Sequence, residues 1–175
     1  SLVDDRAGSL APGTVFAERY RIEALLGQGG MGAVYRATQL AIDRPVALKV
    51  MRADLTHDLR EVARFQQEAR AVAALRHPNV VGLVDFGATE AGALFLVMEY
   101  LVGEPLSARM RREAAFPVPD ILRIALPVLE VLEEAHAQGI IHRDMKPENL
   151  FLATVGRRTD IVKVLDFGIA KVTGG

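Results

Sequence analysis

The feature that most constrains the fold of this chain is a change in its hydrophobic period. Early in the sequence, short apolar runs with alternating character stand between glycines and prolines, which is typical of β-strands. From residue 58 to 76 the spacing of apolar residues becomes helical, two more strand-like segments follow, and helical patterns dominate after residue 105. The pattern predicts an α+β fold in which a mainly antiparallel sheet with one helix precedes a helical part.

The individual elements follow from the same patterns. Strands are predicted at 20–26, 33–38, 46–50, 80–86, 94–100, 139–141, 150–153 and 161–165, and residues 1–17 are predicted to be a leader or loop. Helices are predicted at 58–76, 106–112 and 120–137, the last with Asp120 as its N-cap. This last helix is apolar nearly all round, which predicts burial on most sides. Pro127 lies inside it and is expected to kink it or to remove a hydrogen bond.

Composition excludes several classes of protein. The chain has 175 residues, of which 50% are hydrophobic and 25% charged, so one globular domain with a real core is expected. The net charge of −1 gives no general attraction to nucleic acid or anionic membrane. No apolar run is long enough to span a membrane, and the first residues do not resemble a signal peptide. Cysteine is absent, which excludes disulfides and fits a cytoplasmic location.

A glycine cluster and a lysine indicate phosphate binding. The segment Gly27-Gln28-Gly29-Gly30-Met31-Gly32 lies between two predicted strands. Glycines allow backbone amides to approach phosphate oxygens without a side-chain clash. In the next strand Ala47 and Lys49 point to one side, and Glu68 on the following helix is a suitable partner for the Lys49 ammonium. A dinucleotide-binding fold has similar glycine spacing but requires a helix directly after it and a parallel βαβ unit.

The segment His142-Arg143-Asp144-Met145-Lys146-Pro147-Glu148-Asn149 is the strongest single signal. Asp144 can accept a hydroxyl proton, Lys146 can neutralise a transferring phosphate, and Asn149 can offer a metal ligand. Asp166 follows a predicted strand and can bind the same Mg²⁺, because hard cations prefer carboxylate oxygen. His142 is expected to be a packed, structural histidine.

Taken in order, these segments resemble the bacterial serine/threonine protein kinases of the eukaryotic-like superfamily. The likeness covers about residues 18–172 and includes Leu26 to Tyr35, Lys49, His77-Pro78-Asn79, Val97-Met98-Glu99-Tyr100, His142 to Asn149 and Asp166-Phe167-Gly168. It implies a two-lobed fold with a complete N-lobe at 18–101 and a partial C-lobe at 102–175. It also implies transfer of the ATP γ-phosphoryl group, with Mg²⁺ or Mn²⁺, to a serine or threonine of a protein substrate.

The resemblance assigns roles to individual residues. Asp144, Lys146, Lys49 and Glu68 would be catalytic, and Asn149 and Asp166 would bind the metal. Met98 would be the gatekeeper and the backbone of Glu99 to Leu101 the adenine-binding hinge. The whole nucleotide-binding set would be Leu26, Gly27, Gln28, Gly29, Gly30, Met31, Gly32, Val34, Ala47, Lys49, Met98, Glu99, Leu101 and Phe151.

The position of Asp166-Phe167-Gly168 adds an expectation about activity. In kinases the segment that receives the protein substrate follows this triplet, and only Ile169 to Gly175 follow it here. The chain is therefore expected to bind ATP and metal but to phosphorylate poorly or not at all. An interaction fragment and a pseudokinase-like scaffold are the alternatives, although a pseudokinase is expected to lack Lys49, Asp144 or Asp166. The helix at 120–137 is expected to expose apolar surface, which a homodimer would cover.

Overall fold

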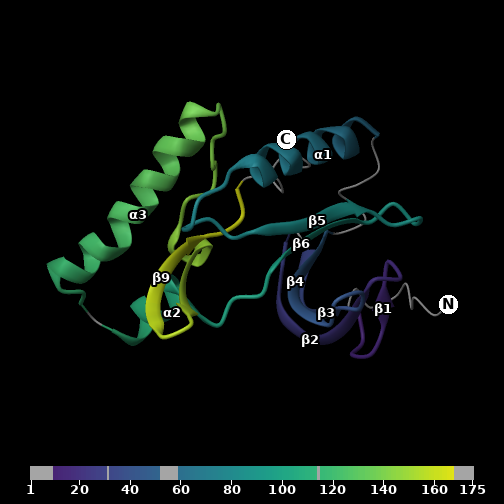
Figure 1. Ribbon diagram of the computed structural model, residues 1–175, viewed down its shortest axis with the longest axis horizontal. Helices are drawn as coiled ribbons and strands as arrows, with labels where there is room; N and C mark the ends of the chain where they lie inside the picture. The colour runs from purple at the N-terminus through teal and green to yellow at the C-terminus, as the bar shows by residue number, and fades with distance from the viewer. Residues whose placement is uncertain (1–9, 31, 52–58, 114, 168–175) are drawn as a thin grey trace. The chain divides into compact units, whose positions relative to one another are not determined.

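The computed structural model describes residues 10–30, 32–51, 59–113 and 115–167 (Figure 1). These residues form two compact units. Unit 1 contains residues 1–66 and 83–100, and unit 2 contains residues 67–82 and 101–172, each as far as the structure describes them. Helix α1 (Leu59–Ala74) passes from the first unit into the second. The helix predicted at 58–76 is thereby confirmed.

Unit 1 is built on an antiparallel sheet of six strands. Their order in the sheet is β1-β2-β3-β4-β6-β5. The bounds are β1 (Val15–Phe16), β2 (Tyr20–Gly29), β3 (Gly32–Gln39), β4 (Arg44–Met51), β5 (Leu83–Ala88) and β6 (Leu94–Glu99). The glycine cluster thus connects two antiparallel strands. A dinucleotide-binding fold is excluded here, because it would require a helix and a parallel crossover after the glycines.

The core of unit 1 lies on one face of this sheet. Alternate residues of β3 are buried, as the period of two requires. In β4 the neighbours Leu48 and Lys49 are both buried, and in β6 the four residues from Leu94 to Val97 are all buried, so these two strands are covered in part on both faces. The sheet curves strongly: Tyr20 Oη donates a hydrogen bond to Asp85 Oδ2 over 2.6 Å, although their strands are not neighbours in the sheet. Arg19 Nη1 donates to the same oxygen over 2.7 Å. Burial, and then the hydrogen bond to Asp85, raise the pKa of the Tyr20 hydroxyl.

Two strand predictions differ from the structure of this sheet. β1 pairs with β2 within a segment that was predicted to be a leader or loop, and its Phe16 is buried against Phe95. A strand of two residues is too short to produce a readable period. β5 begins at Leu83 rather than at residue 80. Val80 instead forms a parallel bridge with Val164 in unit 2.

Unit 2 combines a small sheet with helices (Figure 1). Its antiparallel sheet has the order β7-β8-β9. The elements are β7 (Gly103–Pro105), α2 (Leu106–Arg112), α3 (Val118–Ala137), the short 3-10 helix η2 (Pro147–Asn149), β8 (Leu150–Val155) and β9 (Arg158–Val164). The helix predicted at 106–112 and the hairpin predicted from 150 to 165 are confirmed. A Cβ on Gly103 would overlap the Leu152 carbonyl oxygen, which explains glycine at this close strand approach.

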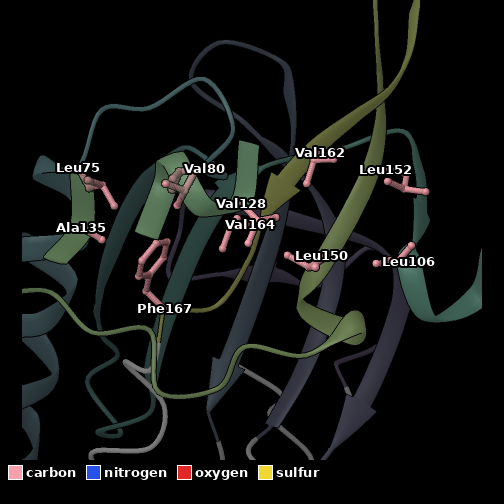
Figure 2. Close-up of a cluster of buried hydrophobic side chains, with 11 residues drawn as sticks. Leu75, Val80, Leu106, Val128, Ala135, Leu150, Leu152, Val162, Val164 and Phe167 are labelled. Atoms are coloured by element: carbon pink, nitrogen blue, oxygen red, sulfur yellow. The ribbon is translucent and has the colours of Figure 1, made fainter. Parts of the chain in front are cut away.

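The core of unit 2 joins α3 to the β8–β9 hairpin (Figure 2). Val128, Val131 and Ala135 are the buried residues of α3. They belong to one cluster with residues of the turn after α1, of α2, of both hairpin strands and of the segment that follows β9. The other members are Leu75, Val80, Leu106, Leu150, Leu152, Val162, Val164 and Phe167. Phe167, next to the predicted metal ligand Asp166, is therefore part of the core.

Helix α3 begins and ends differently from the sequence prediction. Its N-cap is Pro117, and Asp120 lies in the first turn, where it forms an ion pair with Arg123 over 3.1 Å. Pro119 explains the earlier start, because proline is favoured in the first turn of a helix. At the other end Gly139 N–H donates to His136 O and Ile140 N–H to Ala135 O. These bonds form a Schellman motif, so the strand predicted at 139–141 is wrong.

Among the described residues α3 is not buried on most sides, whereas the expected exposure of apolar surface on this helix is confirmed. Val128, Val131 and Ala135 form one buried stripe, whereas Leu122 and Leu129 are 49% and 59% exposed. The exposed apolar stripe has helical spacing of its own; its members are Val118, Ile121, Leu122, Leu126 and Leu129. Whether a second copy of the chain covers it stays a prediction. None of the described helices is long and apolar enough to cross a membrane.

Candidate active site

The glycine-rich segment forms a tight hairpin in unit 1. Gly29 of β2 pairs with Gly32 of β3, so the turn contains Gly30 and Met31, of which Met31 lies outside the described residues. Gly32 has φ +146°, and a Cβ there would overlap the carbonyl oxygen of Val50 in β4. Gly27, Gly29 and Gly30 have open space where a Cβ would lie. Glycine is therefore needed at position 32 for a structural reason. At the other three positions the open space leaves room for a ligand to approach the backbone.

Strand register places the predicted nucleotide-binding residues of unit 1 on one face. Val34 of β3 pairs with Lys49 of β4, and Ala47 pairs with Met98 of β6. Residues that pair across antiparallel strands share a face, as do residues two apart in one strand. All four side chains therefore lie on the face opposite the unit 1 core, which contains Val46 and Leu48. Gly27 pairs with Val34 and joins the same face.

The remaining predicted nucleotide residues lie at strand ends and in the second unit. Leu26 and Gln28 are exposed residues of β2, and Glu99 ends β6. Leu101 directly follows unit 1 in the chain and belongs to unit 2. Phe151 is a half-buried residue of β8. Because Leu101 and Phe151 belong to the other unit, their contact with one nucleotide stays a prediction.

In unit 2 the segment from His142 to Asn149 is held by His142. Its ring is 2% exposed and packs on Phe167, with ring centroids 4.8 Å apart. Nε2 lies 2.7 Å from Leu165 O, and Asp144 N–H donates to Nδ1 over 3.3 Å. A carbonyl only accepts and an amide N–H only donates, so these contacts fix the neutral tautomer with its proton on Nε2. His142 is thus a structural residue, as predicted.

Asn149 orients the predicted base. It is 7% exposed, and its Nδ2 donates to the backbone oxygen of Asp144 over 2.8 Å and to Asp144 Oδ2 over 3.1 Å. Because both partners are acceptors, the amide nitrogen must lie on this side. Asn149 Oδ1 therefore lies on the other side of the amide, and its role as a metal ligand stays a prediction. Lys146 Nζ lies 3.4 Å from Asp144 Oδ2 and completes a cluster of base, ammonium and amide.

Asp166, the second predicted metal ligand, directly follows a residue that is hydrogen-bonded to Asn149. Leu165 N–H donates to Asn149 O over 2.8 Å, and Asp166 is the next residue. Asp166 has φ +47° and Arg143 has φ +62°, a left-handed conformation that costs energy for a residue with a side chain. The structure therefore brings Asn149 and Asp166 together from the two ends of the β8–β9 hairpin. Mg²⁺ commonly takes one or two such protein ligands together with substrate phosphates.

Glu68 has a partner that the sequence did not predict. Arg143 Nη1 donates to Glu68 Oε1 over 3.3 Å, and both residues belong to unit 2. The expected partner, Lys49, is a buried residue of unit 1. A Lys49–Glu68 pair would join the two units and stays a prediction. Neither the motif nor its spacing indicated the Arg143 contact, because it depends on the tertiary packing of α1.

A second polar network lies at the far end of the hairpin in unit 2. Arg109 of α2 binds Glu104 over 2.6 Å and Asp160 over 2.9 Å, and Arg112 donates two hydrogen bonds to Glu104. The hydrogen bonds from Arg112, and then those from Arg109, lower the pKa of Glu104 to about 2. The network ties β7, α2 and β9 together, so a structural role accounts for it.

Comparisons with known proteins bear on this site. The chain matches the protein kinase domain family over residues 20–175. It is 50% identical to the serine/threonine-protein kinase pkn3 of Myxococcus xanthus over 161 residues, which are 92% of this chain and 29% of that protein. It is 42% identical to a probable serine/threonine-protein kinase PknB of Lactococcus lactis, over 91% of this chain and 25% of that protein. The chain thus spans between about a quarter and a third of the curated relatives named here.

A solved structure shows the same fold. The crystal structure of the PknI kinase domain from Mycobacterium tuberculosis has a TM-score of 0.79 and 33% identity to this chain. The match covers 92% of this chain and 64% of that one.

Proposed function

The chain belongs to the protein kinase family, in its bacterial serine/threonine branch, and from this membership we propose that it carries the catalytic machinery for transfer of the ATP γ-phosphoryl group to a serine or threonine hydroxyl. The observation that supports this best is the cluster of Asp144, Lys146 and Asn149 in unit 2. It brings an acceptor for the hydroxyl proton, a cation for the phosphate and a neutral oxygen ligand for a metal into one short segment.

The proposed nucleotide site uses the face of the unit 1 sheet that carries Val34, Ala47, Lys49 and Met98. Val34 and Ala47 supply apolar contact for the purine, and Lys49 supplies a positive charge for the phosphates. The open space at Gly27, Gly29 and Gly30 fits a phosphate chain held by backbone amides. ATP is the cofactor that these groups fit.

The proposed metal ligands are Asn149 Oδ1 and the Asp166 carboxylate. The orientation of the Asn149 amide fits this role, because its nitrogen donates the hydrogen bonds to Asp144. The amide oxygen takes no part in those hydrogen bonds. Mg²⁺ or Mn²⁺ bound by these two groups would neutralise charge on the ATP phosphates. The residues present therefore fit the cofactor pair that the family uses.

In the proposed reaction Asp144 accepts the proton of the substrate hydroxyl. The hydroxyl oxygen forms a bond to the γ-phosphorus while the bond to the bridging oxygen breaks, and ADP leaves with that electron pair. Lys146, 3.4 Å from Asp144 Oδ2, can hold the transferring phosphoryl group beside the base. Most of the acceleration would come from positioning and charge stabilisation.

Calorimetry with ATP and with adenosine tests the nucleotide part of the proposal. Lys49→Met should weaken binding of ATP much more than binding of adenosine, because Lys49 is assigned to the phosphates. Arg44→Met is the matched control, since it removes a positive charge at the exposed start of the same strand. Equal losses for both ligands in Lys49→Met would contradict the assigned role. A turnover assay on the same chain separates a transferring enzyme from a binding fragment.

A further inference from the structure

We propose that Asn79 is a positioning residue for the metal ligand Asp166, acting through strand β9. The inference rests on the function proposed above, and both residues belong to unit 2. In the sequence, His77-Pro78-Asn79 contributed only to the resemblance to the kinases. In the structure this turn contacts the strand that leads to Asp166.

Asn79 binds β9 through both its side chain and its backbone. Its Nδ2 donates to Val162 O over 2.8 Å, and Val164 N–H donates to its carbonyl oxygen over 2.7 Å. Val81 N–H then donates to Val164 O over 3.0 Å, and Val80 forms a parallel bridge with Val164. The last residues of β9 are therefore paired on both edges, with β8 on one side and with residues 79–81 on the other.

The turn that contains Asn79 is itself held by hydrogen bonds and by buried residues on both sides. Asn79 N–H donates to His77 Nδ1 over 3.1 Å, and Val80 N–H donates to His77 O over 3.0 Å. Leu75 before the turn and Val80 after it are 5% and 4% exposed members of the unit 2 core. The Asn79 amide is thus directed at β9 by a turn that is anchored on both sides.

The backbone just before Asp166 is fixed from two directions. On one side, Asn79 and Val81 hold the backbone of Val162 and Val164. On the other side, the segment from His142 to Asn149 holds Leu165 through His142 Nε2 and the Asn149 carbonyl. Asp166 follows directly in a left-handed conformation with φ +47°. A residue in a sparsely populated conformation persists only where its surroundings determine it, and Asn79 supplies one side of those surroundings.

A purely structural role for Asn79 would lower thermal stability and nothing else. A positioning role predicts a further effect: in a variant of Asn79, Mg²⁺ should strengthen ATP binding less than it does in the wild-type chain. A shift of about 1 Å in a reacting group has large effects, so a small movement of Asp166 would weaken metal binding while the nucleotide face of unit 1 stays intact.

The experiment measures ATP affinity of the chain by calorimetry with and without Mg²⁺, and Mn²⁺ binding to the ATP complex by electron paramagnetic resonance. The variant is Asn79→Asp, which has the same shape but cannot donate to Val162 O. Loss of this hydrogen bond should reduce the tightening of ATP binding by Mg²⁺ by roughly threefold to tenfold. Affinity for metal-free ATP should change by less than about twofold. Asn79→Ser, a milder loss of the same bond, replaces Asn79→Asp if that variant fails to fold.

Arg109→Gln is the matched control, because it removes an anchor at the start of β9, the ion pair with Asp160. It should lower the melting temperature and leave the Mg²⁺ effect unchanged. If Asn79→Asp and Asn79→Ser lower only the melting temperature, or if either strengthens the Mg²⁺ effect, the inference is wrong and the proposed function stands. If the wild-type chain shows no Mg²⁺-dependent ATP binding, the proposed function fails and this inference fails with it.

Discussion

The two units place their site residues by different physical means. In unit 1, Val34, Ala47, Lys49 and Met98 share a face because strands alternate and their register is regular. In unit 2, Asp144 and Asn149 lie on an irregular segment that side-chain hydrogen bonds hold in place. Regular backbone tolerates changes in single side chains, because its geometry comes from many main-chain bonds. An irregular segment depends on a few buried groups, so single substitutions should affect it more.

The largest expected effect is on turnover in unit 2. Asp144→Asn should reduce the rate of phosphoryl transfer by roughly 10²–10⁴-fold, the range typical of a lost general base. ATP affinity should stay close to that of the wild type, because the base contacts the substrate hydroxyl. The measurement is steady-state transfer from radiolabelled ATP by an active form of the protein. Asp43→Asn, in an exposed turn of unit 1, is the control. An unchanged rate in Asp144→Asn at saturating ATP would remove the base assignment.

The next largest effect tests how the irregular segment is held. His142→Ala removes a buried ring together with its contacts to Leu165 O and Asp144 N–H, and should destabilise the chain by about 3 kcal/mol or more. Val34→Ala in unit 1 should weaken ATP binding with a much smaller loss of stability, since Val34 is only half-buried on the open face. Thermal melts and ATP titrations of both variants check this. Equal destabilisation by the two would contradict the distinction between the units.

A third prediction separates two roles within the glycine cluster of unit 1. Gly32→Ala should destabilise the chain by roughly 1–3 kcal/mol, because its φ is +146° and its Cβ would meet the Val50 carbonyl. Gly29→Ala, where the space is open, should change stability by less than about 0.5 kcal/mol but weaken ATP binding. Chemical denaturation and calorimetry measure the two quantities. If Gly29→Ala proved the more destabilising of the pair, the register at the hairpin would be wrong.

The smallest effect concerns the polar network of unit 2. The pKa of Glu104 is lowered to about 2 by Arg112 and Arg109. Its contribution to stability is therefore complete above the ordinary glutamate pKa of about 4.3 and is lost as the pH falls toward 2. The melting temperatures of wild type and Glu104→Gln should differ most above pH 5 and converge near pH 2. The difference should be small and shrink at high salt, as for exposed ion pairs. A difference independent of pH would contradict the lowered pKa.

Local patterns in the sequence predicted much of the fold. Period-two alternation located most strands of unit 1, and alternation within β4 placed Ala47 and Lys49 on the same side. Helical spacing located α1 and α3 to within a few residues. The errors lie where competing local chemistry decided the outcome. Pro119 moved the start of α3, and the Schellman motif at Gly139 replaced a predicted strand.

The sequence by itself determined the family, the type of most elements and the residue types available for chemistry, because periods and glycines are local properties. The tertiary structure decided which partners those residues have. Three contacts illustrate this. Asn79 binds Val162, His142 binds Leu165 and Arg143 binds Glu68, and the partners are 83, 23 and 75 positions apart in the sequence. No local pattern encodes such pairs. They arise when the chain packs and each buried donor must find an acceptor.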